Sequence, residues 1–515
     1  MINLSTYLES SALAHPDKTA LIFDDEKWTF KQVNEKACAV ANGLKEIGVA
    51  KGDRVTLFLP NCTEFFFWYF GILKFGAIVN PLNVMLKEKE LDYLIDDCKP
   101  KVIVTTGELS TEPLKIFSRD DCLVDKMIVI GGDNGDNILS FENFAGKQSL
   151  EFNCVQVKEN DLAAILYTSG TTGLPKGVML THTNLWTNGR HCVDWAETTY
   201  KDITVCALPL FHSYALTHVI AELWMAGGTI VWINRFDAAK CFEAMAKYKA
   251  TAFHGVGTMF YAMVHHQNVD DYAKKINLRY CVTGAAATPE PILNKWNEKF
   301  TDLSEGYGMT ETSPVVMMNP IAGKGVQKVS SCGVPIVEEI EVAAMDINNN
   351  PVKTGESGEL VVRGMNVMKG YWNKPEATAD TIINGWLHTG DMVYFDEDGY
   401  CYVKDRIKDM IITGGFNIYP KEIEDLLYTH PAVGEVQVIG IKDGEKGELA
   451  VACIALQPGM SADQDEIITF CKNNIAVYKT PRKVLFFGEL PKTVTGKLEK
   501  VSLRKMVKER LFKNY

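Results

Sequence analysis

The chain has little of several features that would place it in a membrane, in a disulfide scaffold or on nucleic acid. No apolar run approaches the roughly 18 to 20 residues needed to span a bilayer. Residues 1–17 lack the basic segment and apolar core of a secretory signal. The 13 cysteines are scattered singly without a C-x-x-C pair, which favours reduced thiols over disulfides or a zinc site. We therefore expect a cytoplasmic protein without a transmembrane segment.

An excess of positive charge is also missing. The net charge is −12, whereas affinity for nucleic acid comes chiefly from Lys and Arg side chains that neutralise phosphates. We therefore expect no nucleic-acid partner, and a small anionic ligand would need a local basic site.

The remaining composition is that of a globular protein, with 46% hydrophobic and 23% charged residues. A chain of 515 residues predicts about three or four domains or lobes. The densest aromatic stretch, FFFWYF at residues 65–70, is short and indicates a buried helix. A peripheral membrane contact is the alternative for this stretch, and a homodimer stays open.

Short β-rich segments alternate with helical patterns between residues 30 and 303. This alternation predicts parallel sheets covered by helices, and we expect two such sheets packed together. The expected strands are residues 55–59, 102–105, 205–208, 229–233, 252–255 and 280–283.

The pattern changes beyond Gly333 to closely spaced strands, such as 338–343 and 358–363, which predict a smaller β subdomain. A charged segment, 405–409, follows an expected strand at 400–404. The rest has its own α+β pattern, with helices at 420–429, 462–474 and 501–512 and strands at 436–441, 449–456 and 484–487. We predict an α/β protein with a large N-terminal domain (1–404), a hinge (405–409) and a small, mobile C-terminal lid domain (410–515).

The most informative motif is YTSGTTGLPK at residues 167–176, which follows the apolar segment 162–166. Gly170 and Gly173 allow close backbone approach, so the loop can wrap a polyphosphate. The candidate phosphate contacts are Thr168, Ser169, Thr171, Thr172 and Lys176. An ordinary Ser/Thr/Gly turn is the alternative. The usual P-loop, G-x-x-x-x-G-K-[ST], is absent because the lysine follows Pro175, which disfavours a GTPase or P-loop kinase.

Three further motifs follow in order: GYGMTET at 306–312, GWLHTGD at 385–391 and PKTVTGK at 491–497. With the glycine-rich loop, they make the chain similar to the adenylate-forming (AMP-forming) acyl-CoA synthetases, over nearly its whole length. The resemblance implies an ATP-dependent ligase that joins a small-molecule carboxylic acid to coenzyme A through an acyl-AMP intermediate. It also implies Mg²⁺, since a divalent ion offsets the charge of the triphosphate.

The resemblance assigns roles to the middle motif. It implies that Tyr307 lies against adenine, that Thr310 contacts phosphate and that Glu311 holds Mg²⁺. A strand end with a capping Thr and an exposed Glu is the alternative. Upstream, Gly284, Ala285 and Ala286 offer small side chains beside which a flat purine could lie, although Gly-Ala runs also serve helix packing.

Three charged residues complete the site that the resemblance implies. Asp391 and Arg406 match the ribose contacts, and Lys497 matches a lysine of the small domain that touches both the carboxylate and the α-phosphate. A lysine about 4 Å from such an oxygen contributes roughly 4 kcal/mol at an effective dielectric near 20. The alternatives are a turn residue for Asp391, half of a surface ion pair for Arg406 and a solvated surface residue for Lys497.

Thioester formation needs a second arrangement, because Lys497 at the phosphate leaves no path for a thiol. The family resolves this by rotating the small domain, and Lys408 matches its hinge position. The resemblance then places pantetheine along Gly414 and Gly415, whereas the residues themselves indicate only flexibility.

The acid is the least defined partner. His212 in LPLFHS matches an aromatic-His pair at the carboxylate entrance, with a satisfied core histidine as the alternative. Amino-acid adenylation domains usually carry Asp here, so a peptide-synthetase role is disfavoured. The expected acyl pocket is apolar, and it consists of Val256, Gly257, Met309 and Val315. Plain core packing is the alternative for neighbouring apolar residues.

We therefore predict a medium- or long-chain fatty-acid–CoA ligase, with fatty-acid metabolism as its commonest setting. The alternatives are an aryl-acid ligase of the coumarate or benzoate kind and an acyl-AMP ligase that loads a carrier protein. A non-catalytic nucleotide sensor should lack a charged group needed for chemistry. Lys497, Glu311, Asp391 and Arg406 are all present, which disfavours a sensor.

Overall fold

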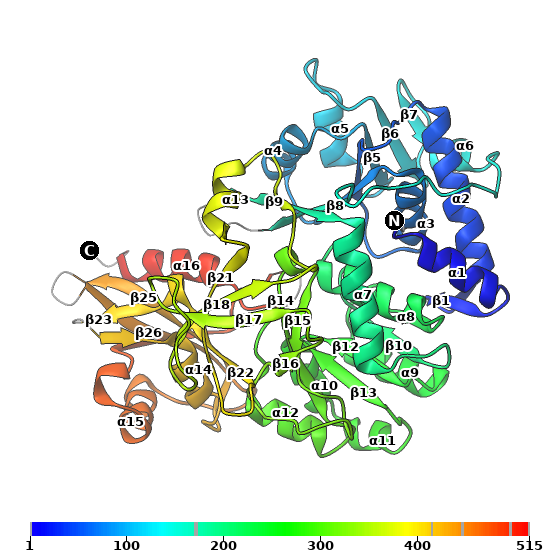
Figure 1. Cartoon of the computed structure of the whole chain (residues 1–515). Helices are drawn as coiled ribbons and strands as arrows, with labels where there is room; N and C mark the ends of the chain where they lie inside the picture. The colour runs from blue at the N-terminus through cyan, green and yellow to red at the C-terminus, as the bar shows by residue number, and fades with distance from the viewer. Residues whose placement is uncertain (1–2, 169–173, 414–415, 444–446, 494–496, 513–515) are drawn as a thin grey trace.

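The computed structural model describes residues 3–168, 174–413, 416–443, 447–493 and 497–512. It has a large N-terminal part built on two sheets, a β subdomain and a smaller C-terminal domain (Figure 1). The predicted α/β fold class is confirmed.

The first sheet has nine strands in the order β16-β15-β14-β13-β12-β10-β11-β1-β2. Their bounds are β1 Thr19–Phe23, β2 Glu26–Thr29, β10 Ile203–Cys206, β11 Thr229–Trp232, β12 Ala252–Gly255, β13 Tyr280–Thr283, β14 Leu303–Gly308, β15 Val315–Met318 and β16 Val334–Pro335. The six adjacent strands β14-β13-β12-β10-β11-β1 pair in parallel. The strands outside them, β2 at one edge and β15 and β16 at the other, pair antiparallel. Two expected strands match β12 and β13 residue for residue, and β10 begins two residues earlier than expected.

The second sheet has eight strands in the order β19-β9-β8-β4-β3-β5-β6-β7. Their bounds are β3 Arg54–Phe58, β4 Ile78–Pro81, β5 Val102–Thr106, β6 Lys126–Ile130, β7 Ile138–Ser140, β8 Leu162–Thr168, β9 Lys176–Thr181 and β19 Gly370–Tyr371. The expectation of parallel pairing is wrong for β8 and β9, which run antiparallel. Residues 169–175 between them are too few for a crossover, which needs about a dozen.

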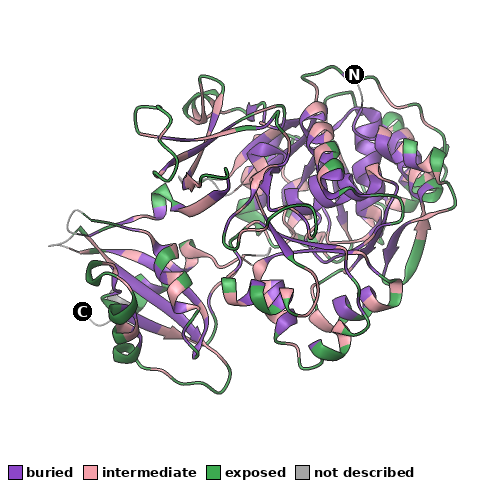
Figure 2. Cartoon of the chain, turned by 60° about the horizontal axis from the view of Figure 1, so that its bottom comes forward, coloured by how far each residue is buried: buried purple, intermediate pink, exposed green. Residues whose placement is uncertain are grey.

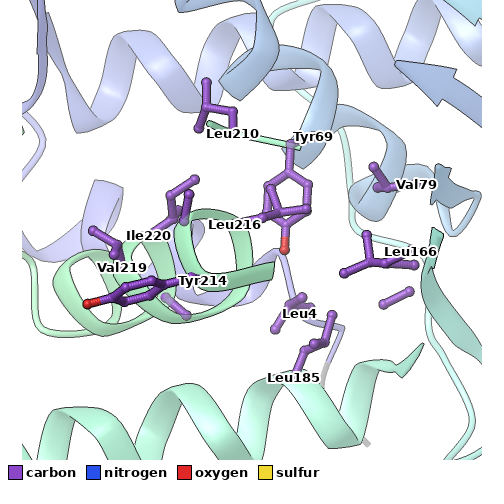
Figure 3. Close-up of a cluster of buried hydrophobic side chains, with 14 of the residues drawn as sticks. Leu4, Tyr69, Val79, Leu166, Leu185, Leu210, Tyr214, Leu216, Val219 and Ile220 are labelled. Carbon is purple, nitrogen blue, oxygen red and sulfur yellow. The ribbon is translucent and has the colours of Figure 1, made fainter. Parts of the chain in front are cut away.

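Helices cover and separate the two sheets (Figure 1). They are α1 Thr6–Ala14, α2 Phe30–Glu46, α3 Thr63–Phe75, α4 Glu88–Cys98, α5 Thr111–Phe117, α6 Phe141–Ala145, α7 His182–Ala196, η1 Tyr214–Val219, α8 Ile220–Met225, α9 Ala238–Tyr248, α10 Gly257–Val264, α11 Val269–Ala273 and α12 Glu290–Asn297. The largest core cluster joins both sheets to α2, α3 and α8. Within it, Tyr214 and Ile220 lie along the helix η1–α8, with Leu185 of α7 below and Tyr69 of α3 beside them (Figure 3).

The aromatic stretch at 65–70 is a helix at the centre of this core, as predicted. Every residue of α3 except Glu64 is buried, and buried segments fill the interior of the large N-terminal part of the molecule (Figure 2). Phe66 and Phe70 both pack on Trp224 of α8, with ring centroids 5.4 and 5.2 Å apart. This stretch therefore presents no surface to a membrane. No helix among the described residues is long and apolar enough to cross one.

The β subdomain contains a sheet in the order β17-β18-β21-β20, with β22 paired to β21. Its elements are β17 Glu341–Met345, β18 Gly358–Arg363, α13 Pro375–Thr381, β20 Ile382–Ile383, β21 Trp386–Phe395 and β22 Cys401–Arg406. The strand expected at 338–343 begins three residues later, because the Ile340 amide closes a turn onto Val337. β22 continues to Arg406, and the domain boundary at 404 stays a prediction.

The C-terminal domain has a sheet in the order β24-β23-β26-β25, with β27 parallel to β26. Its elements are η3 Ile407–Asp409, β23 Ile411–Thr413, β24 Phe416–Ile418, α14 Pro420–Leu427, β25 Val433–Asp443, β26 Gly447–Leu456, α15 Gln464–Asn474, η4 Val477–Lys479, β27 Lys483–Phe487 and α16 Lys500–Phe512. The predicted helices are confirmed. α14 starts at a proline in its first turn, and its buried Ile423 and Leu427 are spaced i, i+4.

Candidate active site

The glycine-rich motif lies in the β8–β9 hairpin. Thr168 and Lys176 are direct partners in the antiparallel ladder, so they face each other across the base of the loop. The Lys176 ammonium lies 4.7 Å from the centroid of the Tyr371 ring. The predicted contacts Ser169, Gly170, Thr171, Thr172 and Gly173 lie outside the described residues.

A second group of predicted residues meets where β14, β21 and β22 come together. Tyr307 donates a hydrogen bond of 2.5 Å to Oδ2 of Asp391, and Arg406 Nε lies 3.5 Å from the other carboxylate oxygen. Burial raises the pKa of Asp391, whereas Arg406 and the Tyr307 hydroxyl lower it. The predicted adenine and ribose contacts thus lie together around one buried carboxylate.

Glu311 and Thr310 lie in the short helix η2 (Thr310–Thr312) directly after β14. Glu311 is buried and accepts a 2.9 Å hydrogen bond from the Tyr371 hydroxyl. Its pKa is raised by burial, while Arg406 and Lys176 act in the opposite direction. A single carboxylate that leaves room for phosphate oxygens is a usual protein ligand of Mg²⁺, so Glu311 fits the predicted ion.

The small residues 284–286 follow β13 at the C-terminal end of the first sheet. Ala285 has φ +70°, a left-handed conformation that is uncommon for alanine. A Cβ on Gly284 would stand 3.4 Å from the carbonyl oxygen of Gly306 and 3.8 Å from the ring of Tyr214. The strained turn therefore brings bare backbone close to Tyr307, as expected for a surface that receives a flat ring.

His212 is half-buried at the start of the helical segment that contains η1. Its Nδ1 accepts the Tyr214 amide proton at 3.2 Å. Burial, with a further contribution from Lys497, lowers its pKa to about 3. The ring is therefore neutral, with its single proton on Nε2. The adjacent Ser213 hydroxyl lies 3.3 Å from the Thr310 hydroxyl, which links the His212 segment to η2.

Lys497 reaches this site from the C-terminal domain. Burial first, and then repulsion from Arg406, lowers its pKa to about 8, whereas Asp391 partly opposes the shift. The charge of Lys497 also contributes to the lowered pKa of His212. The backbone of Lys497 pairs with Thr493: its amide donates to the Thr493 hydroxyl at 3.1 Å, and its carbonyl accepts from the Thr493 amide at 2.6 Å. The structure thus brings Lys497 together with His212, Asp391 and Arg406.

The remaining predicted residues are more dispersed. Val256 and Val315 are buried in the core that joins the two sheets, and Met309 packs against it. Gly257 starts α10 next to Thr288. Lys408 is an exposed residue of η3 between the two domains, and Gly414 and Gly415 lie outside the described residues.

Sequence reasoning missed three residues that contact the predicted ones. Tyr371 touches both Glu311 and Lys176, Ser213 contacts Thr310, and Tyr214 lies between His212 and Gly284. Tyr371 is about 60 residues from its partner along the chain, so no local pattern identifies it. Ser213 and Tyr214 adjoin His212, which is the one signal that could have found them.

Two family models match the chain: the AMP-binding enzyme model covers residues 8–372, and the AMP-binding enzyme C-terminal domain model covers residues 422–497. The chain belongs to the AMP-binding enzyme family. Together with the relatives below, this establishes an adenylate-forming acid–CoA ligase and confirms the predicted enzyme class.

Curated relatives differ in the acid that their names specify. The chain is 36% identical to a long-chain-fatty-acid–CoA ligase of Bacillus subtilis (strain 168), over 96% of this chain and 93% of the relative. It is 34% identical to a feruloyl-CoA synthase of Amycolatopsis sp., over 95% and 96%. Identity at this level does not separate fatty acids from aryl acids.

A solved structure with two states informs the domain arrangement. ATP-bound MatB from Rhodopseudomonas palustris superposes with a TM-score of 0.91 at 31% identity, covering 99% of both chains. Apo MatB, at 30% identity and the same coverage, gives 0.78. The present arrangement is therefore closer to the ATP-bound state of that protein, which agrees with the position of Lys497.

Proposed function

We propose that this protein converts a predominantly apolar carboxylic acid to its CoA thioester in two half-reactions, with an acyl-AMP intermediate and release of pyrophosphate and AMP. The observation that carries the proposal is the convergence of Lys497 from the C-terminal domain with His212, Asp391 and Arg406 from the N-terminal part. These groups can serve an anionic acid and an anionic nucleotide at one place.

ATP would be held by residues from both sheets. The hairpin that contains Thr168 and Lys176 supports the predicted phosphate loop, because its strand ladder fixes both ends of the loop. Asp391 would accept the ribose hydroxyl protons with Arg406 beside it, and residues 284–286 and Tyr307 would enclose the base. A glycine-rich loop for phosphates and a buried carboxylate for ribose are chemically complementary to a nucleotide.

The first half-reaction joins two anions, so electrostatics dominates its barrier. The Lys497 ammonium would bridge the acid carboxylate and the α-phosphate, which stabilises charge as the new bond forms. Thr310 would hold phosphate through its hydroxyl. When bound, Mg²⁺ would be held by Glu311 and would neutralise the phosphates of the departing pyrophosphate.

His212 is suited to positioning rather than to proton transfer. Its Nδ1 is engaged by the Tyr214 amide and its pKa is about 3, so at neutral pH it offers one N–H donor and no charge. Such a donor would orient the acid carboxylate without neutralising it and would leave the attacking oxygen anionic.

The second half-reaction requires that Lys497 leave the site. We propose that the C-terminal domain turns about Lys408, an exposed residue in the η3 segment between the domains. Gly414 and Gly415 would then line the path of pantetheine. The greater similarity to ATP-bound than to apo MatB supports two arrangements in this family.

For the acid, a medium- or long-chain fatty acid is the first candidate and an aryl acid the second. Both candidates are compatible with an apolar pocket formed by Val256, Met309 and Val315 and the backbone of Gly257. The relatives named for long-chain fatty acids and for feruloyl-CoA also leave both acids open. We further propose a cytoplasmic location, and a homodimer stays a prediction.

Acid-dependent pyrophosphate exchange tests the adenylation step, with hexanoate through palmitate, benzoate and coumarate as the panel. Exchange with fatty acids, followed by CoA-dependent thioester formation, is the expected result. Exchange with aryl acids alone would replace the first candidate by the second. Exchange without a CoA thioester would indicate an acyl-AMP ligase that serves a carrier protein, and ATP binding without exchange would indicate a sensor.

A further inference from the structure

Three buried side chains outside the adenylation residues form a polar group, which we name the His–Glu–His cluster. It consists of His218 on η1, Glu222 on α8 and His254 on β12, and one ligand atom from each lies within 4.8 Å of the others. His218 Nε2 lies 2.9 Å from Glu222 Oε2, whereas His254 Nε2 lies 3.8 Å from the same oxygen.

Two members of the cluster are satisfied and one is not. Glu222 Oε1 accepts hydrogen bonds from the Thr198 hydroxyl, at 2.8 Å, and from the Tyr280 hydroxyl, while Oε2 contacts His218. His254 is completely buried, yet neither of its ring nitrogens has a hydrogen-bond partner within the described part of the chain. An unpaired buried imidazole is costly, so these two ring nitrogens favour an additional hydrogen-bonding partner.

Strand geometry relates His254 to the adenylation site. Successive side chains of a strand alternate between faces. On β12 and just beyond it, Ala252 and Val256 belong to the core that joins the two sheets, whereas Phe253 belongs to the separate core on the other face. His254 therefore lies on the same face as Val256, the expected wall of the acyl pocket.

The neighbouring strand fixes the depth of the cluster. His254 is paired in register with Val282 of β13, and Gly284 follows two residues later along that strand. At about 3.3 Å per residue, His254 lies roughly 7 Å below the strand ends that contact the nucleotide site. The Tyr214 ring lies between them: its centroid is 6.3 Å from that of His254, and its edge is 3.8 Å from a Cβ placed on Gly284. Tyr214 occupies the same helix as Val219 and Ile220 (Figure 3).

The charges of the cluster indicate which group fits. Burial opposes the charging of His218, but Cys192 and Glu222 together raise its pKa to about 10. Burial likewise disfavours the ionised Glu222, but His218 lowers its pKa. These two side chains form a balanced ion pair. Burial lowers the pKa of His254 to about 4, so that ring is neutral and offers one donor and one acceptor. A charged ligand group here would be unbalanced, whereas a hydroxyl can both donate and accept.

Resting on the proposed function, we propose that His254 binds a hydroxyl group on the acid substrate, remote from the carboxylate that becomes activated. The substrate class is then an otherwise apolar acid with a distal hydroxyl, either a hydroxylated fatty acid or a phenolic aryl acid. His254 is a specificity-determining residue in this proposal, and it lies beside the ion pair of His218 and Glu222.

Matched pairs of acids test the proposal: 8-hydroxyoctanoate against nonanoate, and 4-hydroxycinnamate against 4-methylcinnamate. Each pair exchanges a hydroxyl for a methyl group of similar size. With saturating ATP and CoA, kcat/KM for AMP release should favour the hydroxylated member of at least one pair by tenfold or more, because a site built to bind a hydroxyl rejects the analogue that lacks it. His254→Leu should abolish or reverse the preference, and His254→Gln, which can still donate and accept, should retain part of it.

Thr204→Val is the matched control. Thr204 is also buried, lies on the neighbouring strand β10 in register with Ala252, and has a hydroxyl without a partner among the described residues. This variant should keep the preference of the parent protein. Equal kcat/KM within both pairs, unchanged by His254→Leu, would overturn the proposal while the ligase activity still stood. Stoichiometric metal in the purified protein that is lost in His254→Leu would also overturn it, by making the cluster a metal site. No AMP release with any acid would instead contradict the proposed function.

Discussion

The Tyr307 hydroxyl donates a 2.5 Å hydrogen bond to Asp391, and the same carboxylate faces Arg406 at 3.5 Å. The residue predicted to lie against adenine thus also holds the residue predicted to bind ribose. Tyr307 comes from β14 of the first sheet and Asp391 from β21 of the β subdomain, so this contact joins two different sheets at the proposed nucleotide site.

Replacing these two residues should have unequal effects. Asp391→Asn keeps the shape but removes the charge, and we expect the KM for ATP to rise by about 10- to 100-fold, since hydrogen bonds to charged groups contribute about 1.5–3 kcal/mol. Tyr307→Phe keeps the aromatic ring and should raise the KM for ATP by less than about tenfold. Steady-state kinetics with ATP as the varied substrate measure both. A larger effect for Tyr307→Phe than for Asp391→Asn would contradict the assignment of the carboxylate to ribose.

Glu311 should determine the Mg²⁺ dependence of adenylation. Glu311→Gln retains the hydrogen bond from Tyr371 but removes the anionic ligand, so we expect a loss on the order of 100-fold and a higher Mg²⁺ concentration at half-maximal rate. Glu376→Gln, on the exposed start of α13, is the control and should match the parent protein. An unchanged Mg²⁺ titration for Glu311→Gln would exclude Glu311 as the ligand.

The rate of adenylation should fall as the pH rises through about 8. Lys497 is charged below its pKa and neutral above it, and burial together with Arg406 lowers that pKa to about 8. The kcat/KM for ATP in pyrophosphate exchange, measured between pH 6 and 10, should therefore decrease on the alkaline side. Lys497→Arg remains charged across this range, so its rate, although lower, should lack that decrease. A parent profile flat to pH 10 would show that Lys497 titrates elsewhere.

The packing of α3 against α2 should be sensitive to a single methyl group. A Cβ on Gly71 would lie 2.5 Å from Val40 and 2.9 Å from the Ala37 carbonyl oxygen. Overpacking of this kind costs about 1–3 kcal/mol, which outweighs the roughly 1 kcal/mol that alanine gains in a helix. Gly71→Ala should thus lower the free energy of unfolding in urea. Gly488→Ala, where nothing lies within 4 Å, should change it by less than about 0.5 kcal/mol. Equal stability of the two variants would show that α2 and α3 relax apart.

Much of the fold could be predicted because its signals are local. Residues 252–255 and 280–283 are short apolar strands bounded by turns, and the structure has them at those positions. The antiparallel strand β9 was not predicted, since alternation of strands and helices favours parallel pairing and the short connection of residues 169–175 overrides it.

The candidate site was predictable where its residues lie in one motif, as with Thr310 and Glu311. It was not predictable where partners are distant in sequence. His254 lies in an apolar strand and Glu222 in an apolar helix, so each resembles a core position, and only the tertiary structure reveals that they meet. The expected acyl pocket was therefore apolar, whereas the structure adds a polar group on the same face.

Lys497→Met tests the central claim most directly, because it removes the ammonium group and keeps the length of the side chain. Pyrophosphate exchange should fall by about 100- to 1,000-fold, the usual effect of losing one group that stabilises transition-state charge. Conversion of a supplied acyl-AMP to acyl-CoA should continue at a rate close to that of the parent protein, because the proposed domain rotation removes Lys497 from the site in that step. An exchange rate equal to the parent's, in a protein shown to be folded, would contradict the delivery of Lys497 to the phosphate.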